Sequence, residues 1–288
     1  MASRHSIPLP YLLPSLLFLI AVILFPLIYG FYLSFTDLSF RVPESGRLIG
    51  LGNYLSLFSD VDCQHSLVRT MYFVAISITT TLLIGVGLSF LFYFYNPIGS
   101  SLFRTLFLIP ITIPPVVIGL NFRFMLTPEI GVVSYIINSF LGYKIDFFSP
   151  ELALTTIALV DAWQWSPFVF AIYLTALEGL PKGPIEAAQL DGASKRQLIS
   201  NIILPMTKPI LLAMGIIRLM DSLREFDKVY VMTKGGPGSA SEIINLYIWK
   251  VGLSWLDIAR AVAMAIILLF VIELLSTIIL RMFKGGGG

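Results

Sequence analysis

Cysteine, histidine and charged residues are all scarce in this chain of 288 residues. It contains one cysteine, Cys63, and two histidines, His5 and His65. A single cysteine excludes an intrachain disulfide and a metal site built from several cysteines. Both histidines lie outside the long apolar runs, so no His/Asp/Cys constellation predicts an enzyme or a metal centre. Charged residues make up only 12% of the chain, about half of their share in soluble domains.

The chain also lacks the motifs of nucleotide-binding and nucleic-acid-binding proteins. No Gly-Lys-Ser/Thr sequence follows Gly235–Gly238, so this glycine-rich stretch is a poor candidate for a phosphate-binding loop. A net charge of +2 without a basic tract gives no support for a nucleic-acid partner. No internal repeat of the kind found in many secondary transporters is visible either. Because the phosphate-binding motif and the basic tract are both missing, we expect this chain to bind no cofactor and no nucleic acid.

Apolar residues, by contrast, are abundant. They make up 57% of the chain, and the mean hydropathy is +0.87. They form six runs, each longer than the roughly 20 residues that cross the hydrocarbon core of a bilayer. These lengths favour helices over barrel strands, because backbone groups in lipid must be hydrogen-bonded internally. The sequence predicts an all-α integral membrane protein with six transmembrane helices, at about Tyr11–Phe35, Leu67–Tyr95, Leu102–Leu126, Glu151–Leu177, Ile202–Phe226 and Leu256–Phe283.

The first apolar run is expected to be a retained span rather than a signal peptide. Arg4 and His5 precede it, but the run is too long and ends without a small-residue cleavage site. We expect residues 1–66 to form this helix and an outer loop, and residues 67–284 to form a five-helix core with a polar loop at 178–205. The four glycines at 285–288 are expected to be a flexible tail or a cloning remnant.

The polar stretch Glu186–Pro205, between two apolar runs, is the most informative part of the chain. Pro181 and Pro184 suit the first turn of a short helix that runs to about Asp191. Gly192 then stands where a left-handed residue ends such a helix. Ser194 and Gln197 form a capping-box pattern for a second helix, which Pro205 and Pro209 perturb. The stretch therefore predicts two short helices at a membrane surface, although an ordinary amphipathic loop has similar composition.

The same stretch resembles a loop of a known family. It reads Glu-Ala-Ala, three residues, Gly, nine residues, Ile, one residue, Leu-Pro. This pattern is similar to the cytoplasmic EAA loop of the membrane-spanning permease subunits of binding-protein-dependent ABC importers. We call Glu186–Pro205 the EAA loop. The resemblance implies the type I permease fold and a role in docking an ATPase subunit for Glu186, Ala187, Ala188, Asp191, Gly192, Ile202, Leu204 and Pro205.

The resemblance extends from about Pro10 to Lys284 and points to one branch of the family. Phe25-Pro26, Gly50–Tyr54, Phe103-Arg104 and Trp163–Pro167 look like segments of sugar-importer permeases. Phe226–Thr233, followed by Gly235–Gly238, resembles an outer loop of the carbohydrate and glycerol-3-phosphate branch, of the MalF and UgpA type.

This family resemblance implies a heteromeric assembly. The expected partners are two ATPase subunits that bind ATP and Mg, a second homologous permease subunit, an extracytoplasmic solute-binding protein and the lipid bilayer. The chain itself would be a transport subunit and no enzyme.

Orientation follows mainly from the same resemblance. With the EAA loop inside, both termini are cytoplasmic, in the cell membrane of a bacterium or archaeon. Lys and Arg are denser in the short inner segments than in the outer ones, a modest positive-inside bias. Lys228 is assigned to an outer segment.

Polar side chains within the spans are candidates for the translocation path, because charges are costly at mid-bilayer. The fourth run has Asp161 and then Trp163 and Gln164, an aromatic face beside an amide that would suit a sugar. The fifth has Arg218, Asp221, Arg224 and Glu225, whose spacing predicts Arg–Asp and Arg–Glu pairs along one helical face. The residues predicted to line the path are Asn121, Trp163, Gln164, Asp221 and Arg224. Helix pairing and an interfacial tryptophan belt are the alternatives.

The sequence therefore predicts a permease subunit for a di- or oligosaccharide, a polyol or a glycerol phosphate. The alternatives are a permease for a non-sugar solute and an ion-coupled secondary transporter. The second alternative has little support, because few protonatable groups lie mid-span.

Overall fold

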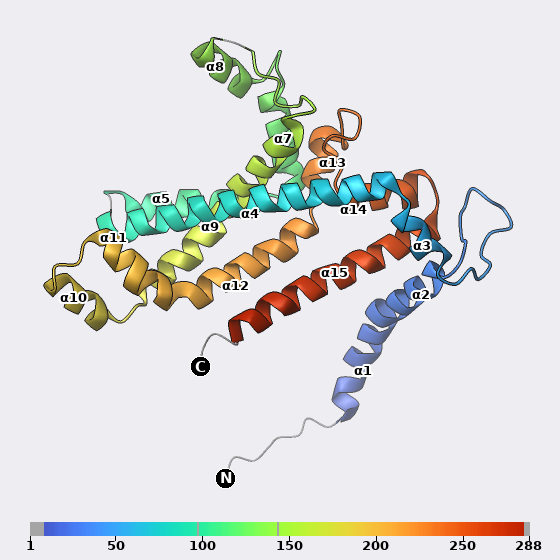
Figure 1. Ribbon diagram of the computed structural model, residues 1–288, viewed down its shortest axis with the longest axis horizontal. Coiled ribbons are helices and arrows are strands. Elements are labelled where there is room, and N and C mark those ends of the chain that lie inside the picture. Colours follow the sequence, from blue (N-terminus) through green and yellow to red (C-terminus); the bar gives the residue numbers. More distant parts are fainter. Residues whose placement is uncertain (1–8, 97, 143, 285–288) are drawn as a thin grey trace. The chain divides into compact units, whose positions relative to one another are not determined.

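The computed structural model describes residues 9–96, 98–142 and 144–284, and their regular structure is helical (Figure 1). The tail predicted at 285–288 lies outside these residues. Within them, the only β pairing outside the helices is an isolated bridge between Thr36 and Leu48. The all-α prediction is therefore confirmed. Contacts divide the chain into unit 1, Met1–Gln64 with Tyr247–Val271, and unit 2, His65–Leu246 with Ile272–Gly288.

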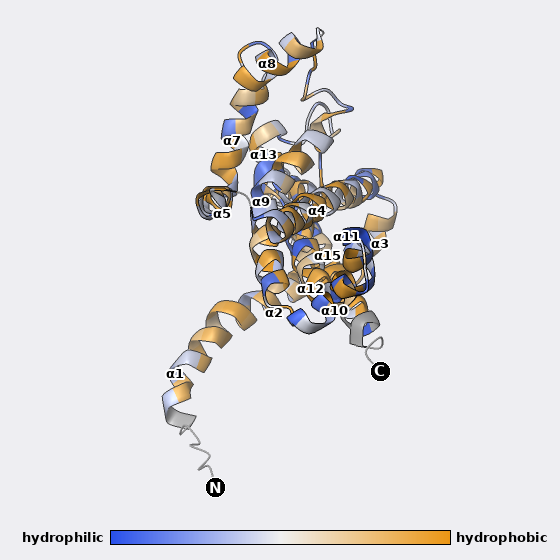
Figure 2. Cartoon of the chain, turned by 90° about the vertical axis from the view of Figure 1, so that its left-hand side faces the viewer, coloured by the Kyte–Doolittle hydropathy of each residue, from blue (hydrophilic) through white to orange (hydrophobic). Residues whose placement is uncertain are grey.

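Five helical segments are long and apolar enough to cross a membrane, and a bent pair supplies a sixth if it counts as one broken span. Figure 2 shows that these segments are predominantly hydrophobic. The five are α1–α2 with the π-turn between them (Leu9–Leu19, Ile20–Leu24 and Phe25–Ser34), α4 (Val61–Tyr95), α9 (Ala153–Glu178), α11–α12 with its π-turn (Lys195–Leu198, Ile199–Ile203 and Leu204–Leu223) and α15 (Ile258–Lys284).

The third predicted span is not one continuous helix. It consists of α5 (Ser100–Phe107), α6 (Ile109–Thr112) and α7 (Pro115–Leu126), with a bend of 99° before α7. Ile113 is extended, with ψ 131°, because a residue before proline is driven out of the helical region. Pro114 and Pro115 also lack the N–H groups that would continue the helix.

The fifth predicted span begins and ends earlier than the sequence indicated. Its helix starts at Lys195 and stops at Leu223, so Glu225 and Phe226 lie beyond it. The π-turn at Ile199–Ile203 lets the EAA loop run directly into α12. Pro205 then occupies the first turn of α12, where a missing N–H costs nothing.

The carboxylate of Asp60 connects three elements of unit 1. Asp60 accepts hydrogen bonds from Tyr247, at 2.8 Å, and Arg260, at 2.6 Å. Burial and the bond to Asp60 raise the pKa of Tyr247. The carboxylate therefore joins α15 to α14 (Ile244–Trp249) and to the turn after α3 (Gly52–Phe58).

The core of unit 2 supports the EAA loop. Val169, Tyr173 and Leu177 of α9 pack with Ile185 of α10 (Lys182–Leu190), and with Leu198, Ile203 and Met214. The Tyr173 hydroxyl lies 2.9 Å from the Thr207 hydroxyl, which fixes α9 against α12. The remaining helices of unit 2 are α8 (Val132–Leu141) and α13 (Asp227–Thr233). Figure 1 shows α10 and α11 as two short helices at one end of this unit.

Candidate functional site

The first half of the EAA loop is a short helix that turns one side toward the core. Helix α10 begins after Pro181, with Pro184 in its first turn as predicted, and ends at Leu190, one residue before the predicted end. Ile185 is buried, whereas Leu190 is 89% exposed, an unusual position for a leucine outside the spans. Gly192 has φ +80° and an added Cβ would meet no atom within 4 Å. The predicted left-handed glycine is thus confirmed. Its backbone conformation requires glycine here, whereas the space around it would admit a side chain.

The second half of the EAA loop starts with the capping box that the sequence predicted. The Gln197 side-chain carbonyl accepts from the Ser194 backbone N–H at 2.9 Å, and the Ser194 hydroxyl accepts from the Gln197 N–H. Leu198 and Ile203 are buried in the core of unit 2. The Lys195 ammonium lies 4.1 Å from the centre of the Tyr95 ring, a cation–π contact with the end of α4.

The predicted docking residues fall into two groups by exposure. The exposed members lie on the outer side of the loop, and among the partly buried ones Ala188 and Ile202 pack against the core of unit 2. The exposed group is Glu186, Ala187, Asp191, Gly192 and Pro205, and the partly buried group is Ala188, Ile202 and Leu204. A knob with an outer contact surface and a core-anchored inner side suits the transmission of force.

A second polar site lies deep in unit 2, and we call it the ionic cluster: Asp161, Arg218, Glu225 and Lys228. Arg218 donates to the Asp161 carboxylate at 2.6 Å, and the Lys228 ammonium lies 3.0 Å from the other Asp161 oxygen. Ser77 of α4 also donates to Asp161. The side chains of Asp161, Arg218 and Lys228 are each 1% exposed. The cluster therefore ties α4, α9, α12 and α13 together.

The cluster corrects the pairing predicted from helical spacing. Glu225 pairs with Lys228, at 2.6 Å, and not with an arginine. Arg218 does contact Asp221 at 3.5 Å, but its closer carboxylate is Asp161 on another helix. Burial alone would lower the pKa of Lys228, but the carboxylates of Asp161 and Glu225 outweigh it and raise that pKa. Lys228 therefore stays protonated although it is buried, a burial that its place after the fifth apolar run did not indicate.

The five residues predicted to line the path occupy different environments. Gln164 is buried and donates to the Ile113 carbonyl at 3.0 Å, next to the bend before α7. Trp163 is 41% exposed, with its ring edge-on to Phe122. Asn121 and Arg224 are exposed, and the Asp221 side chain is 43% exposed. Among the described residues, no side-chain hydrogen bond or ion pair joins any two of the five.

Comparison with known proteins agrees with this geometry. Residues 81–285 match the model of the family described as binding-protein-dependent transport system inner membrane component. The chain is 31% identical to the sulfoquinovosyl glycerol transport system permease protein SmoG of Agrobacterium fabrum, over 95% of this chain and 89% of that protein. It is 32% identical to the trehalose/maltose transport system permease protein MalF of Thermococcus litoralis, over 93% of this chain and 90% of that protein.

The fold also has solved counterparts. A chain of a bacterial ABC transporter that imports the acidic polysaccharide alginate superposes with a TM-score of 0.84, at 21% identity, over 97% of this chain and 95% of that one. This likeness shows the fold. The family match covers most of the chain and includes the EAA loop, and relatives above 30% identity span nearly its whole length. The chain therefore belongs to the family of binding-protein-dependent transport system inner membrane components, the permease subunits of ABC importers.

Proposed function

We propose that this subunit forms half of a translocation path for a carbohydrate or a closely related solute. The observation that carries the proposal is the EAA loop, an exposed knob continuous with a span and anchored in the core of unit 2. The names of two relatives support the solute class, since SmoG is named for sulfoquinovosyl glycerol and the Thermococcus litoralis protein for trehalose and maltose.

The proposed assembly pairs the subunit with a second permease, two ATPases and an extracytoplasmic binding protein. The EAA loop faces the cytoplasm and docks on an ATPase, which binds ATP and Mg. When ATP draws the two ATPases together, the loop moves and carries α12 with it, because Leu198 and Ile203 are fixed in the core. The path then opens outward to receive solute, and release of ADP restores the inward-facing state. Chemistry is confined to the ATPases.

The proposal is tested by assaying ATP hydrolysis in the reconstituted complex with its binding protein. The binding protein is presented with a disaccharide, an oligosaccharide, a polyol and a glycerol phosphate in turn. We expect one carbohydrate to stimulate hydrolysis and to enter proteoliposomes only when ATP is present. Uptake driven by an ion gradient without ATP would instead support the secondary transporter. Stimulation by an amino acid or an inorganic anion alone would overturn the solute class.

Orientation gives a separate prediction. Lys195 and Arg196 are exposed on the EAA loop, so a cysteine at either position, in a Cys63→Ser background, is expected to react only with membrane-permeant maleimides in intact cells. A matched cysteine in place of Arg47, which is exposed in the loop after the first span, should react with impermeant reagents. Reversed labelling of the two positions would invert the proposed topology.

The path residues give another prediction. Trp163→Ala removes an exposed aromatic face, and we expect the half-saturation concentration for transport to rise about fivefold, the effect of one lost aromatic contact. Trp163→Phe keeps an aromatic ring and should retain most of the affinity. Uptake kinetics normalised to assembled complex provide the measurement. If Trp163 only packs against lipid or a neighbouring helix, the amount of complex will fall while the half-saturation concentration stays unchanged.

A further inference from the structure

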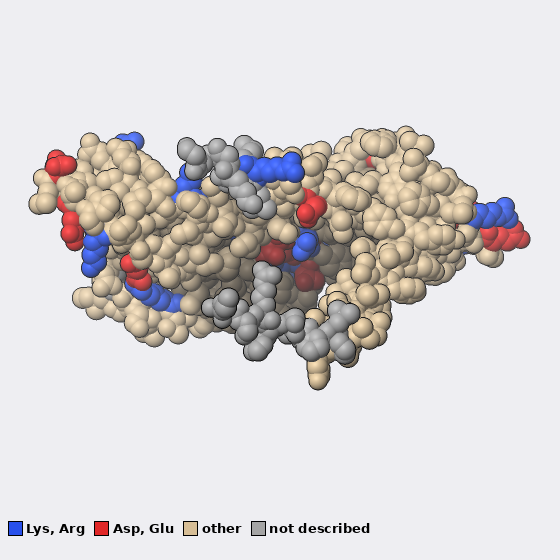
Figure 3. Space-filling model, turned by 90° about the horizontal axis from the view of Figure 1, so that it is seen from below, with Lys and Arg blue, Asp and Glu red and all other residues tan. Residues whose placement is uncertain are grey.

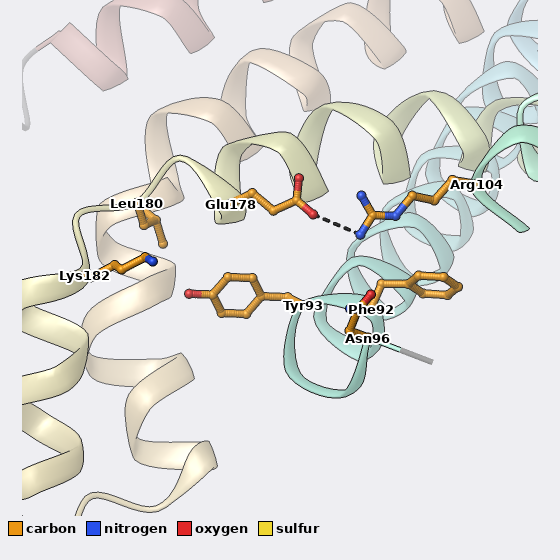
Figure 4. A pocket seen from close by; sticks show the side chains of 7 residues that line it. All are labelled: Phe92, Tyr93, Asn96, Arg104, Glu178, Leu180 and Lys182. Atoms are coloured by element: carbon orange, nitrogen blue, oxygen red, sulfur yellow. Dashed lines mark ion pairs between the residues drawn. The ribbon is translucent and has the colours of Figure 1, made fainter. Parts of the chain in front are cut away.

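A polar pocket of about 330 Å³ opens at the end of unit 2 that carries the EAA loop (Figure 4). Its polar lining consists of Tyr93 and Asn96 at the end of α4, Arg104 of α5, Glu178 at the end of α9 and Lys182 at the start of α10. The pocket thus gathers the ends of two spans and the first residue of the EAA-loop helix α10. Neither the docking surface nor the ionic cluster uses any of these side chains.

The pocket has an excess of hydrogen-bond donors. Arg104 is bound to Glu178 at 2.9 Å, and this pair satisfies the single carboxylate in the lining. The Arg104 Nε is buried and has no hydrogen-bond partner among the described residues. No side-chain hydrogen bond of Tyr93, Asn96 or Lys182 is formed within the described part of the chain either. A guanidinium N–H, an ammonium, a hydroxyl and an amide therefore surround one cavity, with a net charge of +1 from Arg104, Lys182 and Glu178.

We propose that this pocket binds a phosphate group and thereby fixes the start of α10. Arginine and lysine side chains with free donors are the usual partners of phosphate oxygens. Arg104 and Lys182 lie on opposite sides of the pocket (Figure 4), so a phosphate held at Arg104 would draw the flexible Lys182 side chain toward it and so tie α10 to α5 and the ends of α4 and α9. Phosphate binding would then set how tightly α10 of the EAA loop is coupled to the ends of α4, α5 and α9. This regulatory role is separate from the docking of an ATPase.

The surroundings favour a phosphate carried by an anionic membrane lipid. Helices α4 and α9 end at Tyr95 and Glu178, so the pocket lies at the level where these two spans leave the bilayer. Leu102 and Leu106, on the same short helix as Arg104, are 65% and 53% exposed and offer an apolar surface for acyl chains. Figure 3 shows the charged side chains in small, separate groups on the face seen from below. That this lipid belongs to the cytoplasmic leaflet rests on the proposed function, which places the EAA loop in the cytoplasm.

Two features of the pocket disfavour the binding of an anion, and the test must distinguish their effects from phosphate binding. The carboxyl ends of α4 and α9 carry partial negative charge, which Arg104 and Lys182 also offset. Glu178 competes with phosphate for Arg104. If Arg104 only stabilises Glu178 and the helix ends, then Arg104→Gln and Glu178→Gln will have the same effect. If the pocket binds phosphate, the two substitutions will have opposite effects on phosphate affinity.

The experiment uses the whole transporter in nanodiscs of phosphatidylcholine, with phosphatidylglycerol added in one arm and inorganic phosphate in another. Bound lipid is counted by native mass spectrometry, and binding-protein-stimulated ATPase activity is measured in parallel. We expect phosphatidylglycerol to remain bound and to change the stimulated rate. The double variant Arg104→Gln/Lys182→Gln should lose about tenfold in lipid affinity, the scale of losing charged hydrogen bonds. Glu178→Gln should bind lipid more tightly.

The control is Lys208→Gln, an exposed lysine of α12 outside the pocket, which should leave lipid binding unchanged. Equal effects of inorganic phosphate and phosphatidylglycerol would identify a soluble phosphate as the ligand. Equal lipid binding by the wild type and the double variant would overturn the proposal. Stimulated ATPase activity in pure phosphatidylcholine would still support the importer function, so the two proposals fail separately.

Discussion

Asp161→Asn is expected to be the most damaging single substitution in unit 2. The asparagine keeps the shape of the side chain but leaves Arg218 and Lys228 without their shared carboxylate in the interior. Removing one partner of a buried ion pair costs about 3–5 kcal/mol, and only Asp221, 3.5 Å from Arg218, and Glu225, 2.6 Å from Lys228, then remain to offset the two buried cations. The amount of folded permease recovered in the assembled complex, and the midpoint of its thermal unfolding, provide the measurement.

Two further variants separate the ionic cluster from ordinary polar contacts. Asp221→Asn removes the other carboxylate near Arg218, but that side chain is 43% exposed and 3.5 Å away, so we expect a loss of less than about 1 kcal/mol. Asp161→Glu keeps the charge and should fall between the two. If Asp161→Asn and Asp221→Asn are equally mild, the interior charges are solvated and the cluster does not bind the four helices together.

The number of apolar runs and the EAA loop could be predicted from sequence because both depend on local chemistry. Span length is set by the bilayer, and the left-handed Gly192 and the Ser194–Gln197 capping box follow from the backbone needs of adjacent residues. The bend before α7 is also local. Its signal, Pro114 after an apolar run, was present, but a run of apolar residues alone cannot show that the helix breaks within it.

The ionic cluster could not be predicted, because it depends on which helices meet. Spacing along the fifth run offered Arg218 a partner on its own helix, whereas the structure places Asp161 of α9 closer. An unpaired aspartate in an apolar span was the available signal, since such a charge needs a partner from elsewhere. Lys228 gave no such signal, as it follows the fifth run and resembles part of an outer loop.

The cluster and the EAA loop act on the same element. Helix α12 begins at the EAA loop and carries Arg218 near its other end, about 21 Å from Leu204 by helical rise. A displacement of the loop therefore reaches α9 and α13 through the ion pairs of Asp161 with Arg218 and Lys228. Sliding α12 along α9 or α13 would require these buried charges to separate. This arrangement favours movement of α9, α12 and α13 as one body.

Gly192→Val is expected to uncouple transport from ATP hydrolysis. At φ +80° a β-carbon costs about 1–2 kcal/mol, and a β-branched residue is tolerated worst. Because an added Cβ would meet no neighbour within 4 Å, the strain must be relieved by turning α10 relative to α11. The span helices keep their packing, so complex should still assemble while solute uptake per ATP hydrolysed falls. Parallel uptake and ATPase assays on proteoliposomes provide the measurement.

Matched variants identify the cause of that loss. Gly192→Asn, which tolerates the left-handed conformation, should retain much of the coupling. Gly183→Ala, in the first turn of α10 with open space around it, should be neutral or slightly stabilising. Glu186→Lys reverses an exposed charge of the loop and should also uncouple. Because α10 begins at Lys182, Glu186 lies beyond the first turn, and this effect must come from the docking surface rather than from the helix dipole. Normal uptake by Gly192→Val and Glu186→Lys together would exclude this loop as the point where ATPase movement enters the permease.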